Sequence, residues 1–321
     1  MLHRHHLRPA PARAPRIGLL LAAAALVASA CGSSERETPV ATVDGKPLVV
    51  VTYSILGDIV TQLVGDAAHV EVIVPDGADP HDFSASARDI ERMMTAAIVV
   101  ANGLDLEEGL HEALDQVSDG KVPLFDASEH VTVRDLADGE EAHSDEGDDH
   151  GHEGGDPHLW TSAATMAEMV PALTDALEKA LGADLAAQEA AVTAALTELD
   201  AEVQTIIDRI PDGECKLVTG HESLGYFADR YGCELIGAVI PSLSSNAEAS
   251  AKELVELEQL AAQSGVRAVF TEAGTPAEVA EQIAATIGVP LVDLPSHDLP
   301  DSGGYAAFMT DLATRIADAL A

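Results

Sequence analysis

Aromatic side chains and positive charge are both scarce in this 321-residue chain. Phe, Trp and Tyr together make up 3% of the residues, so the hydrophobic core must be aliphatic and rich in alanine. Only 17 residues are Lys or Arg, against 55 Asp or Glu, and the formal net charge is -38 at pH 7. A chain this acidic repels nucleic acids and anionic lipid headgroups, so nucleic acid is not expected as a partner. It attracts cations diffusely, but a diffuse field does not select a metal.

Some of the few basic residues precede an apolar stretch at positions 17–27. They are Arg4, Arg8, Arg13 and Arg16. The stretch is too short and too alanine-rich to span a membrane, and it indicates the hydrophobic region of a signal peptide. The sequence Ala28-Ser29-Ala30-Cys31-Gly32 then resembles a bacterial lipobox. We therefore predict a signal peptide at 1–30, a lipid on Cys31 and a lipid-anchored tether at 31–46; cleavage by an ordinary signal peptidase, without lipid, is the alternative.

Cysteine is also scarce, with three residues in the chain. If Cys31 carries lipid, Cys215 and Cys233 remain as a pair outside the cytoplasm, where disulfides persist. Each of them opens a strand-like run, and the helical segment between the runs allows the two strand starts to be neighbours in a parallel sheet. This arrangement favours a disulfide over two buried thiols.

Short apolar runs without alternation recur along the chain and are separated by segments with helical spacing. The predicted strands are 48–53, 70–74, 97–101, 122–125, 217–219, 235–240, 268–271 and 291–294. Runs of this kind are typical of strands buried on both faces, and helical connections imply parallel pairing. We predict an α/β fold of two lobes, each a mostly parallel sheet flanked by helices. The expected parts are an N-terminal lobe at 47–182, which contains an acidic loop with histidines at 138–156, a linking helix at 183–210, and a C-terminal lobe at 211–321.

The linking segment has few helix breakers between Leu185 and Ile210, and its apolar residues recur at steps of three and four. One helix of this length would run on the order of 39 Å at 1.5 Å per residue. Pro211 and Gly213 would end it. The pattern fits equally an amphipathic helix packed on one lobe and a rigid strut that joins both.

Histidines follow the ends of several predicted strands. His81 and His158 each close an Asp-Pro-His triplet, and His221 follows the run that ends at position 219. Ligands of open α/β sheets gather at the carboxyl ends of the strands, where Asp293 also lies. Zinc prefers four nitrogen, sulfur or oxygen ligands in a tetrahedron. We therefore predict one ion held by His81, His158, His221 and Asp293, two ligands from each half of the chain.

The fourth ligand is the least certain part of this set, because His297 and Glu272 are alternatives to Asp293. Glu272 ends another predicted strand, and we expect it to support the ligands from behind, as we do for Glu222 beside His221. A zinc-protease motif is absent, since no second histidine follows Glu222 at the required spacing.

The first residue of each Asp-Pro-His triplet leaves two interpretations open. Asp79 and Asp156 either steer the imidazoles as hydrogen-bond acceptors or cap a turn. A carboxylate- and histidine-containing tract precedes the second triplet. Its His143, His150 and His152 are candidate auxiliary metal ligands that would collect zinc for the cleft; the alternative is a solvated, disordered loop.

Four stretches carry a resemblance to a known family. They are Asp79-Pro80-His81-Asp82-Phe83, Ala101-Asn102-Gly103-Leu104-Asp105-Leu106-Glu107, Asp156-Pro157-His158-Leu159-Trp160 and Gly220-His221-Glu222-Ser223. Together they resemble the zinc- and manganese-binding solute receptors of bacterial ABC importers, from about residue 49 to residue 320. The resemblance implies that His81, His158 and His221 are metal ligands, that a late acidic residue matching Asp293 is the fourth, and that the long helix is a strut.

The resemblance also bears on the metal. Manganese receptors of this kind usually carry Glu in place of the third histidine, whereas this chain has His221. Three imidazoles favour zinc, which binds nitrogen donors more tightly than manganese does. We expect a monomeric receptor, not an enzyme, that captures Zn²⁺ and passes it to an ABC importer permease and its ATPase. We expect it to be lipid-anchored on the outer face of the cytoplasmic membrane. The alternatives are a manganese receptor, a zinc-dependent hydrolase, and a surface adhesion or metal-storage protein.

Overall fold

The first half of the chain is built on one mostly parallel sheet. The computed structural model describes residues 40–135 and 155–321. The strands of this sheet are β1 (Thr42–Val43), β2 (Lys46–Tyr53), β3 (His69–Val74), β4 (Ile98–Ala101) and β5 (Leu124–Asp126). Strands β3, β2, β4 and β5 are parallel neighbours in that order, and β1 pairs antiparallel with β2. Every residue of β2 from Leu48 onward is buried, as the continuous apolar run predicted.

Helices connect these strands close to the predicted positions. They are α2 (Ser54–Val64), α3 (Ala87–Thr95), the 3-10 turn η1 (Glu108–Leu110), α4 (His111–Asp119) and the 3-10 turn η2 (Ala127–His130). Ser86 caps α3, because its side chain accepts from the amide of Asp89 while the Asp89 carboxylate accepts from the amide of Ser86. The helical connections impose parallel pairing, and parallel pairing places the loops after β3 and β4 at one edge of the sheet.

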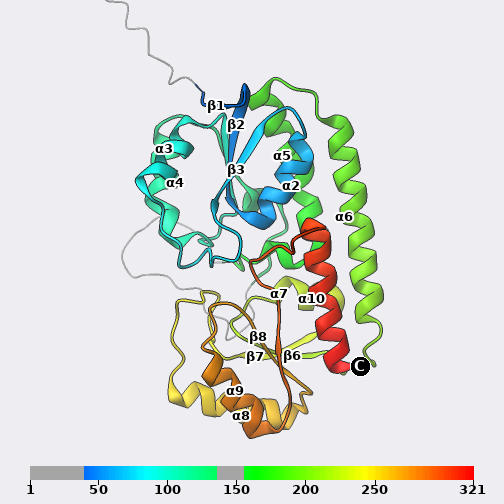
Figure 1. The fold of residues 1–321 in the computed structure, drawn as a ribbon. Coiled ribbons are helices and arrows are strands. Elements are labelled where there is room, and N and C mark those ends of the chain that lie inside the picture. The colour runs from blue at the N-terminus through cyan, green and yellow to red at the C-terminus, as the bar shows by residue number, and fades with distance from the viewer. Residues whose placement is uncertain (1–39, 136–154) are drawn as a thin grey trace, which may run out of the picture. The chain divides into compact units, whose positions relative to one another are not determined.

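Two long helices follow the short turn η3 (Leu159–Thr161). Helix α5 (Ala163–Leu181) ends at Gly182, which adopts a left-handed conformation with φ 65°. Helix α6 (Ala186–Ile207) then confirms the predicted continuous helix to within a few residues. It packs against α2 of the first half and also against α7 and α10, which come later in the chain. Figure 1 shows α6 and α10 running side by side. Helix α6 therefore contacts both halves, as a strut would.

The second half contains two short parallel strand pairs instead of one larger sheet. The pairs are β6 (Lys216–Thr219) with β7 (Glu234–Ala238), and β8 (Val269–Thr271) with β9 (Leu291–Asp293). The helices are α7 (Gly225–Tyr231), α8 (Ala251–Ser264), α9 (Ala277–Ile287) and α10 (Gly304–Leu320). Helix α8 begins at Ala251, because Ser250 and Glu253 form a capping box at its start.

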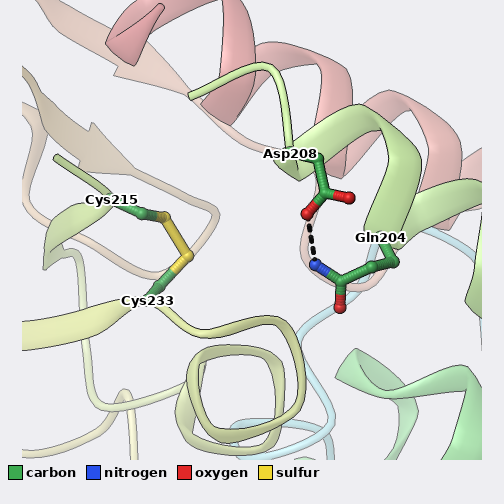
Figure 2. The surroundings of a disulfide bond; sticks show 4 residues. All are labelled: Gln204, Asp208, Cys215 and Cys233. Carbon is green, nitrogen blue, oxygen red and sulfur yellow. Dashed lines mark hydrogen bonds between the residues drawn. A yellow bond between two sulfur atoms is a disulfide. The ribbon is translucent and has the colours of Figure 1, made fainter. Parts of the chain in front are cut away.

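The predicted disulfide is confirmed. Cys215 and Cys233 are bonded, with their Cα atoms 4.7 Å apart. Figure 2 shows this bond between the chain segments that lead into β6 and β7, near the Gln204–Asp208 hydrogen bond (2.8 Å) at the end of α6. The bond therefore ties together the two strands that precede and follow α7.

The buried apolar residues form one large cluster and one small one. The large cluster includes β2, α2, α5, α6 and α10, and extends to Leu217, Phe227 and Phe270 of the second half. The small cluster lies within the second half, among β7, α8, α9 and residues such as Val218 and Val269. None of the described helices has both the length and the hydrophobicity needed to cross a bilayer.

Candidate metal centre

Three buried imidazoles converge at the point where the two halves meet. The Nε2 atom of His158 lies 3.4 Å from Nε2 of His81 and 3.1 Å from Nε2 of His221. All three side chains are buried, with residue exposures of 0–3%. In a tetrahedral zinc site with bonds of 2.0–2.1 Å, the ligand nitrogens lie about 3.3–3.4 Å apart. The nitrogen spacing therefore matches a zinc shell, and among the described residues these three form the one group with metal-ligand spacing.

The two Asp-Pro-His triplets form the same local turn. In each, the aspartate accepts a hydrogen bond from the histidine amide two residues later, from His81 to Asp79 and from His158 to Asp156, both at 3.0 Å. The carboxylates thus fix the backbone on which each imidazole is carried. Asp156 does more, because its Oδ1 also lies 2.8 Å from Nδ1 of His158. The turn-capping interpretation holds for both aspartates, and the steering interpretation holds for Asp156.

Each imidazole has a carboxylate behind it, on the side away from the converging nitrogens. The Nδ1-to-oxygen distances are 2.8 Å for His158–Asp156, 2.8 Å for His221–Glu272 and 3.5 Å for His81–Glu108. A carboxylate that accepts from Nδ1–H leaves the lone pair on Nε2 and aims it at the ion. The structure thus places Glu272 beside Nδ1 of His221, and its support of a metal ligand stays a prediction. Glu108 was not foreseen, because a glutamate at the start of η1 resembles any solvated residue.

A close approach of two backbone segments positions His221. A side chain at Gly220 would place its Cβ 2.0 Å from the Thr275 hydroxyl oxygen, so glycine is required there. This closeness lets Glu272 accept from the amide of His221 (3.1 Å) and from the Ser223 hydroxyl (2.9 Å). The carboxylate of Glu272 is therefore held by several donors at once.

Burial and neighbouring charges shift the pKa values of His158 and His221 in opposite directions. Burial holds the pKa of His158 well below its ordinary value, and the charges of His221 and His81 act in the same direction. Burial also favours the neutral form of His221, but the Glu272 carboxylate outweighs it and raises the pKa of His221. The same pairing lowers the pKa of Glu272 to about 2 in spite of its burial. In the metal-free protein burial thus favours neutral His158, whereas Glu272 favours the protonated form of His221, whose Nε2 proton a metal must displace.

Asn102, which follows β4, anchors the loop that carries His158. Its side-chain amide donates to the carbonyl of Pro157 (2.8 Å), and its side-chain oxygen accepts from the Tyr53 hydroxyl (2.9 Å). The buried carboxylate of Glu107 accepts from the backbone amide of Asn102 (2.9 Å). Both Asn102 and Glu107 belong to one of the stretches that carry the family resemblance. The sequence therefore singled out this segment but did not predict that it anchors the loop of His158.

A polar loop of the second half, residues 244–246, holds the first half beside the cluster. Its contacts are Asn246 Nδ2 to the His81 carbonyl (2.9 Å), Ser245 Oγ to Asp79 Oδ2 (2.6 Å) and Ser244 Oγ to the Glu108 carboxylate. We refer to these contacts as the 244–246 clasp. Nothing in the sequence singled out these residues, since serine and asparagine are ordinary loop residues.

The structure does not bring Asp293 to the cluster. Its side chain is 76% exposed and lies 3.7 Å from Arg315, whereas the imidazoles are buried. The strand β9 ends at Asp293 with its side chain directed to solvent, and the chain turns inward only afterwards. The prediction of Asp293 as fourth ligand is therefore wrong for this structure. Its alternative, His297, is 4% exposed, with its ring centroid 6.4 Å from that of His81.

The other predicted residues have mixed outcomes. Glu222 is half-buried beside His221, and its backbone amide donates to the carbonyl of Ser242 (3.0 Å), but its carboxylate is not part of the metal-ligand group. The lipidation site and the auxiliary ligands lie outside the described residues; they are Cys31, His143, His150 and His152.

Comparisons with known proteins agree with this geometry. Residues 49–319 match the family described as zinc-uptake complex component A, periplasmic. The zinc-binding protein TroA of Treponema pallidum is 30% identical over 239 residues, which cover 74% of this chain and 73% of that protein. A solved structure of periplasmic zinc-binding TroA superimposes with a TM-score of 0.76 at 28% identity, over 86% of this chain and 100% of that chain.

Other relatives differ in length and in metal. The zinc-binding lipoprotein AdcA of Streptococcus pneumoniae is 26% identical over 302 residues, which cover 92% of this chain but only 59% of AdcA. The manganese-binding lipoprotein MntA of Halalkalibacterium halodurans is 26% identical over 252 residues, 77% of each chain. The family match spans most of the chain and includes all three clustered histidines. The chain therefore belongs to the zinc-uptake complex component A family.

Proposed function

We propose that this protein is an extracytoplasmic receptor that captures Zn²⁺ between its two halves and delivers it to an ABC importer. His81, His158 and His221 are the ligands. The observation that carries the proposal is the convergence of their Nε2 atoms at 3.1 and 3.4 Å, the spacing that a tetrahedral zinc ion requires. Without an ion, two Nε2 atoms that face each other at this distance can share only one hydrogen. With an ion bound, the Nε2 lone pairs of all three histidines are donated to the metal.

Zinc is favoured over manganese by the donor set. The three clustered ligands are imidazoles, and the carboxylates near them face the opposite ring nitrogens. Manganese favours carboxylate and water oxygen ligands and stands below zinc in affinity for nitrogen donors. Names of relatives include both metals, so the donor set of this chain is what supports zinc.

The way in which Glu272 is engaged supports binding without chemical turnover. A hydrolase needs an open metal position and a general base beside it. Glu272, the acidic group beside His221, accepts from His221 and Ser223, and its pKa is lowered to about 2 in spite of burial, by His221 above all. A carboxylate so strongly held in its ionised form is a poor proton acceptor at neutral pH. The family consists of binding receptors, and we assign this chain the same role.

The remaining parts of the proposal concern its surroundings. The lipobox-like Cys31 would anchor the protein on the outer face of the cytoplasmic membrane. The partner would be a permease with its ATPase, served by a monomeric receptor, and the boundaries 47–182, 183–210 and 211–321 would define its lobes and strut. The histidine-containing loop would act as an auxiliary collector of zinc.

Competitive titration tests the proposal. Purified, metal-free protein is titrated with Zn²⁺ and Mn²⁺ together, and the bound metal is counted by native mass spectrometry. We expect one tightly bound zinc ion per chain and a change in fluorescence of Trp160, whose ring lies 5.3 Å from that of His158. Several weakly bound ions would indicate storage, preferential binding of manganese would reassign the cargo, and hydrolysis of ester or phosphate substrates would indicate an enzyme.

A further inference from the structure

Three imidazoles leave one corner of a zinc tetrahedron to be filled. The carboxylates near the trio are already occupied. Asp156, Glu272 and Glu108 lie on the Nδ1 sides of the three rings, away from the point where the Nε2 atoms converge. Asp79 accepts from the His81 amide with one oxygen and from the Ser245 hydroxyl with the other. Neither these four nor His297 belongs to the group of atoms with metal-ligand spacing, so a fourth protein ligand must move inward when the ion binds.

His297 lies beside this corner and has an unused nitrogen. The residue is 4% exposed, and its Nε2 has no hydrogen-bond partner among the described residues. Its ring meets that of His81 edge-on, with centroids 6.4 Å apart and planes at 79°. Burying a polar nitrogen without a hydrogen-bond partner costs free energy. An unpartnered, buried nitrogen beside a group of metal-ligand atoms therefore indicates that it binds something in the working protein.

Hydrogen bonds from Trp160 and Ser54 fix the backbone around His297. The indole of Trp160 donates to the carbonyl of Ser296 (3.1 Å), and the Ser54 hydroxyl donates to the carbonyl of His297 (3.2 Å). The Ser296 hydroxyl lies 3.2 Å from Nδ1 of His297. When that hydroxyl accepts from Nδ1–H, the lone pair of the ring is on Nε2, which is the arrangement of a metal-ligating imidazole.

We infer that His297 supplies the fourth nitrogen to the bound zinc ion, in the place where the sequence predicted Asp293. The inference rests on the proposed zinc-receptor function and specifies its ligand shell. The centroid distance of 6.4 Å exceeds the 5.0–5.8 Å among the other three rings, so the His297 ring moves inward when the ion binds.

A shell of four imidazoles has a consequence for metal choice. All four donors are neutral nitrogens, a set that manganese disfavours and zinc accepts. Replacing the expected carboxylate of Asp293 by an imidazole removes the one ligand that would help a harder cation. His297 therefore increases discrimination between zinc and manganese, beyond what the trio provides.

Counting zinc-bound imidazoles in the intact protein tests the inference. Histidine side chains are labelled with ¹⁵N, and long-range ¹H–¹⁵N NMR spectra are recorded on the zinc-loaded protein. We expect four zinc-bound Nε2 resonances in the wild type and three in His297→Gln. We also expect His297→Gln to lower zinc affinity about 10- to 100-fold and to reduce the zinc-to-manganese preference. Asp293→Asn is the matched control and should leave count and affinity unchanged.

The outcomes separate this inference from the receptor proposal. Three zinc-bound resonances in the wild type overturn the role of His297, whatever the affinity of the variant, and this measurement does not depend on how the variant folds. Four resonances together with an unchanged preference in His297→Gln keep the ligand but overturn the selectivity. If the wild type binds no stoichiometric zinc at all, the proposed function fails first.

Discussion

The two halves of the molecule hold the site in different ways. In the first half, four parallel strands are centred on β2, whose six residues from Leu48 to Tyr53 are all buried. In the second half, β8 and β9 are three residues long, and the β6–β7 pair forms no ladder with the β8–β9 pair although β6 lies beside β8. His81 and His158 belong to the first framework, whereas His221 and the inferred His297 belong to the second. The first half therefore holds its ligands on a larger sheet, whereas the second half holds its ligands on short strand pairs that contribute less stability.

The difference indicates what zinc contributes to each half. The second half is held by a disulfide, by α6 and α10, and by contacts with the first half beside the imidazole cluster. A ligand that binds only the folded state stabilises it in proportion to the logarithm of its concentration relative to Kd. We therefore expect zinc to increase protection from hydrogen exchange more in β6–β9 than in β2–β5.

Removing one imidazole from each half is the most severe test of this comparison. We expect His158→Ala and His221→Ala each to lower zinc affinity by more than about 100-fold, above the range typical for supporting residues. His111→Ala is the matched control, because that imidazole lies on the surface and pairs with Asp105. Affinity is measured by competition with a zinc chelator. Normal affinity in one of the two variants would mean that one half binds zinc alone.

Opening the disulfide tests whether the second half depends on it. A bond between residues 18 apart stabilises the fold by about 3 kcal/mol in the chain-entropy description. We expect the double variant Cys215→Ser, Cys233→Ser to lose that stability chiefly in the second half. Urea unfolding followed by hydrogen exchange would then show β6 and β7 opening before β2 and β4. Simultaneous opening of both halves would contradict the comparison.

The supporting carboxylates permit a matched test across the two halves. Glu272 and Asp156 each lie 2.8 Å from the Nδ1 atom of a ligand. We expect Glu272→Gln and Asp156→Asn to weaken zinc binding about 10- to 100-fold each, because the carboxylate beside Nδ1 no longer orients the lone pair on Nε2. Isothermal titration with a competing chelator gives both values. An unchanged affinity in either variant would show that its carboxylate serves only the fold.

The sequence predicted much of this framework and part of the site. Continuous apolar runs located β2 and β4, because strands buried on both faces leave little choice of residue. His81 and His221 follow strand ends and His158 repeats the Asp-Pro-His triplet, and these features together located the trio. Asp293 failed because a strand end fixes where a residue lies along the chain but not which way its side chain points.

Other contacts were missed because they join distant segments. Glu108 and Ser244 are 136 positions apart, and neither lies in a pattern with periodicity. The order of elements predicts which loops share an edge, but the reach of one side chain toward another depends on the packed structure. The 244–246 clasp is visible only once both halves are folded.

The pH dependence of zinc binding should reflect the different protonation of the ligand histidines in the two halves. Burial keeps the pKa of His158 well below its ordinary value, so this ligand stays neutral as pH falls from 7. Although burial opposes it, Glu272 raises the pKa of His221, so this ligand must lose a proton to bind zinc. Below that raised pKa, we expect apparent affinity to fall about tenfold per pH unit, and to be regained above it. Glu272→Gln should move the fall to lower pH, and a curve that stays in place would assign the proton elsewhere.

The 244–246 clasp should produce the smallest effect, and on a rate. Asn246 and Ser245 donate to the His81 carbonyl and to Asp79, so they hold the two halves together beside a ligand. A single hydrogen bond contributes about 0.5–1.5 kcal/mol net, which corresponds to a factor of about 2 to 12 in a rate. We expect Ser245→Ala and Asn246→Ala each to speed zinc release by this factor in a stopped-flow chelator chase. Thr286→Ala, whose hydroxyl bonds only its own helix, is the control. Equal release rates in all of these proteins would show that the clasp does not hold the halves closed over the ion.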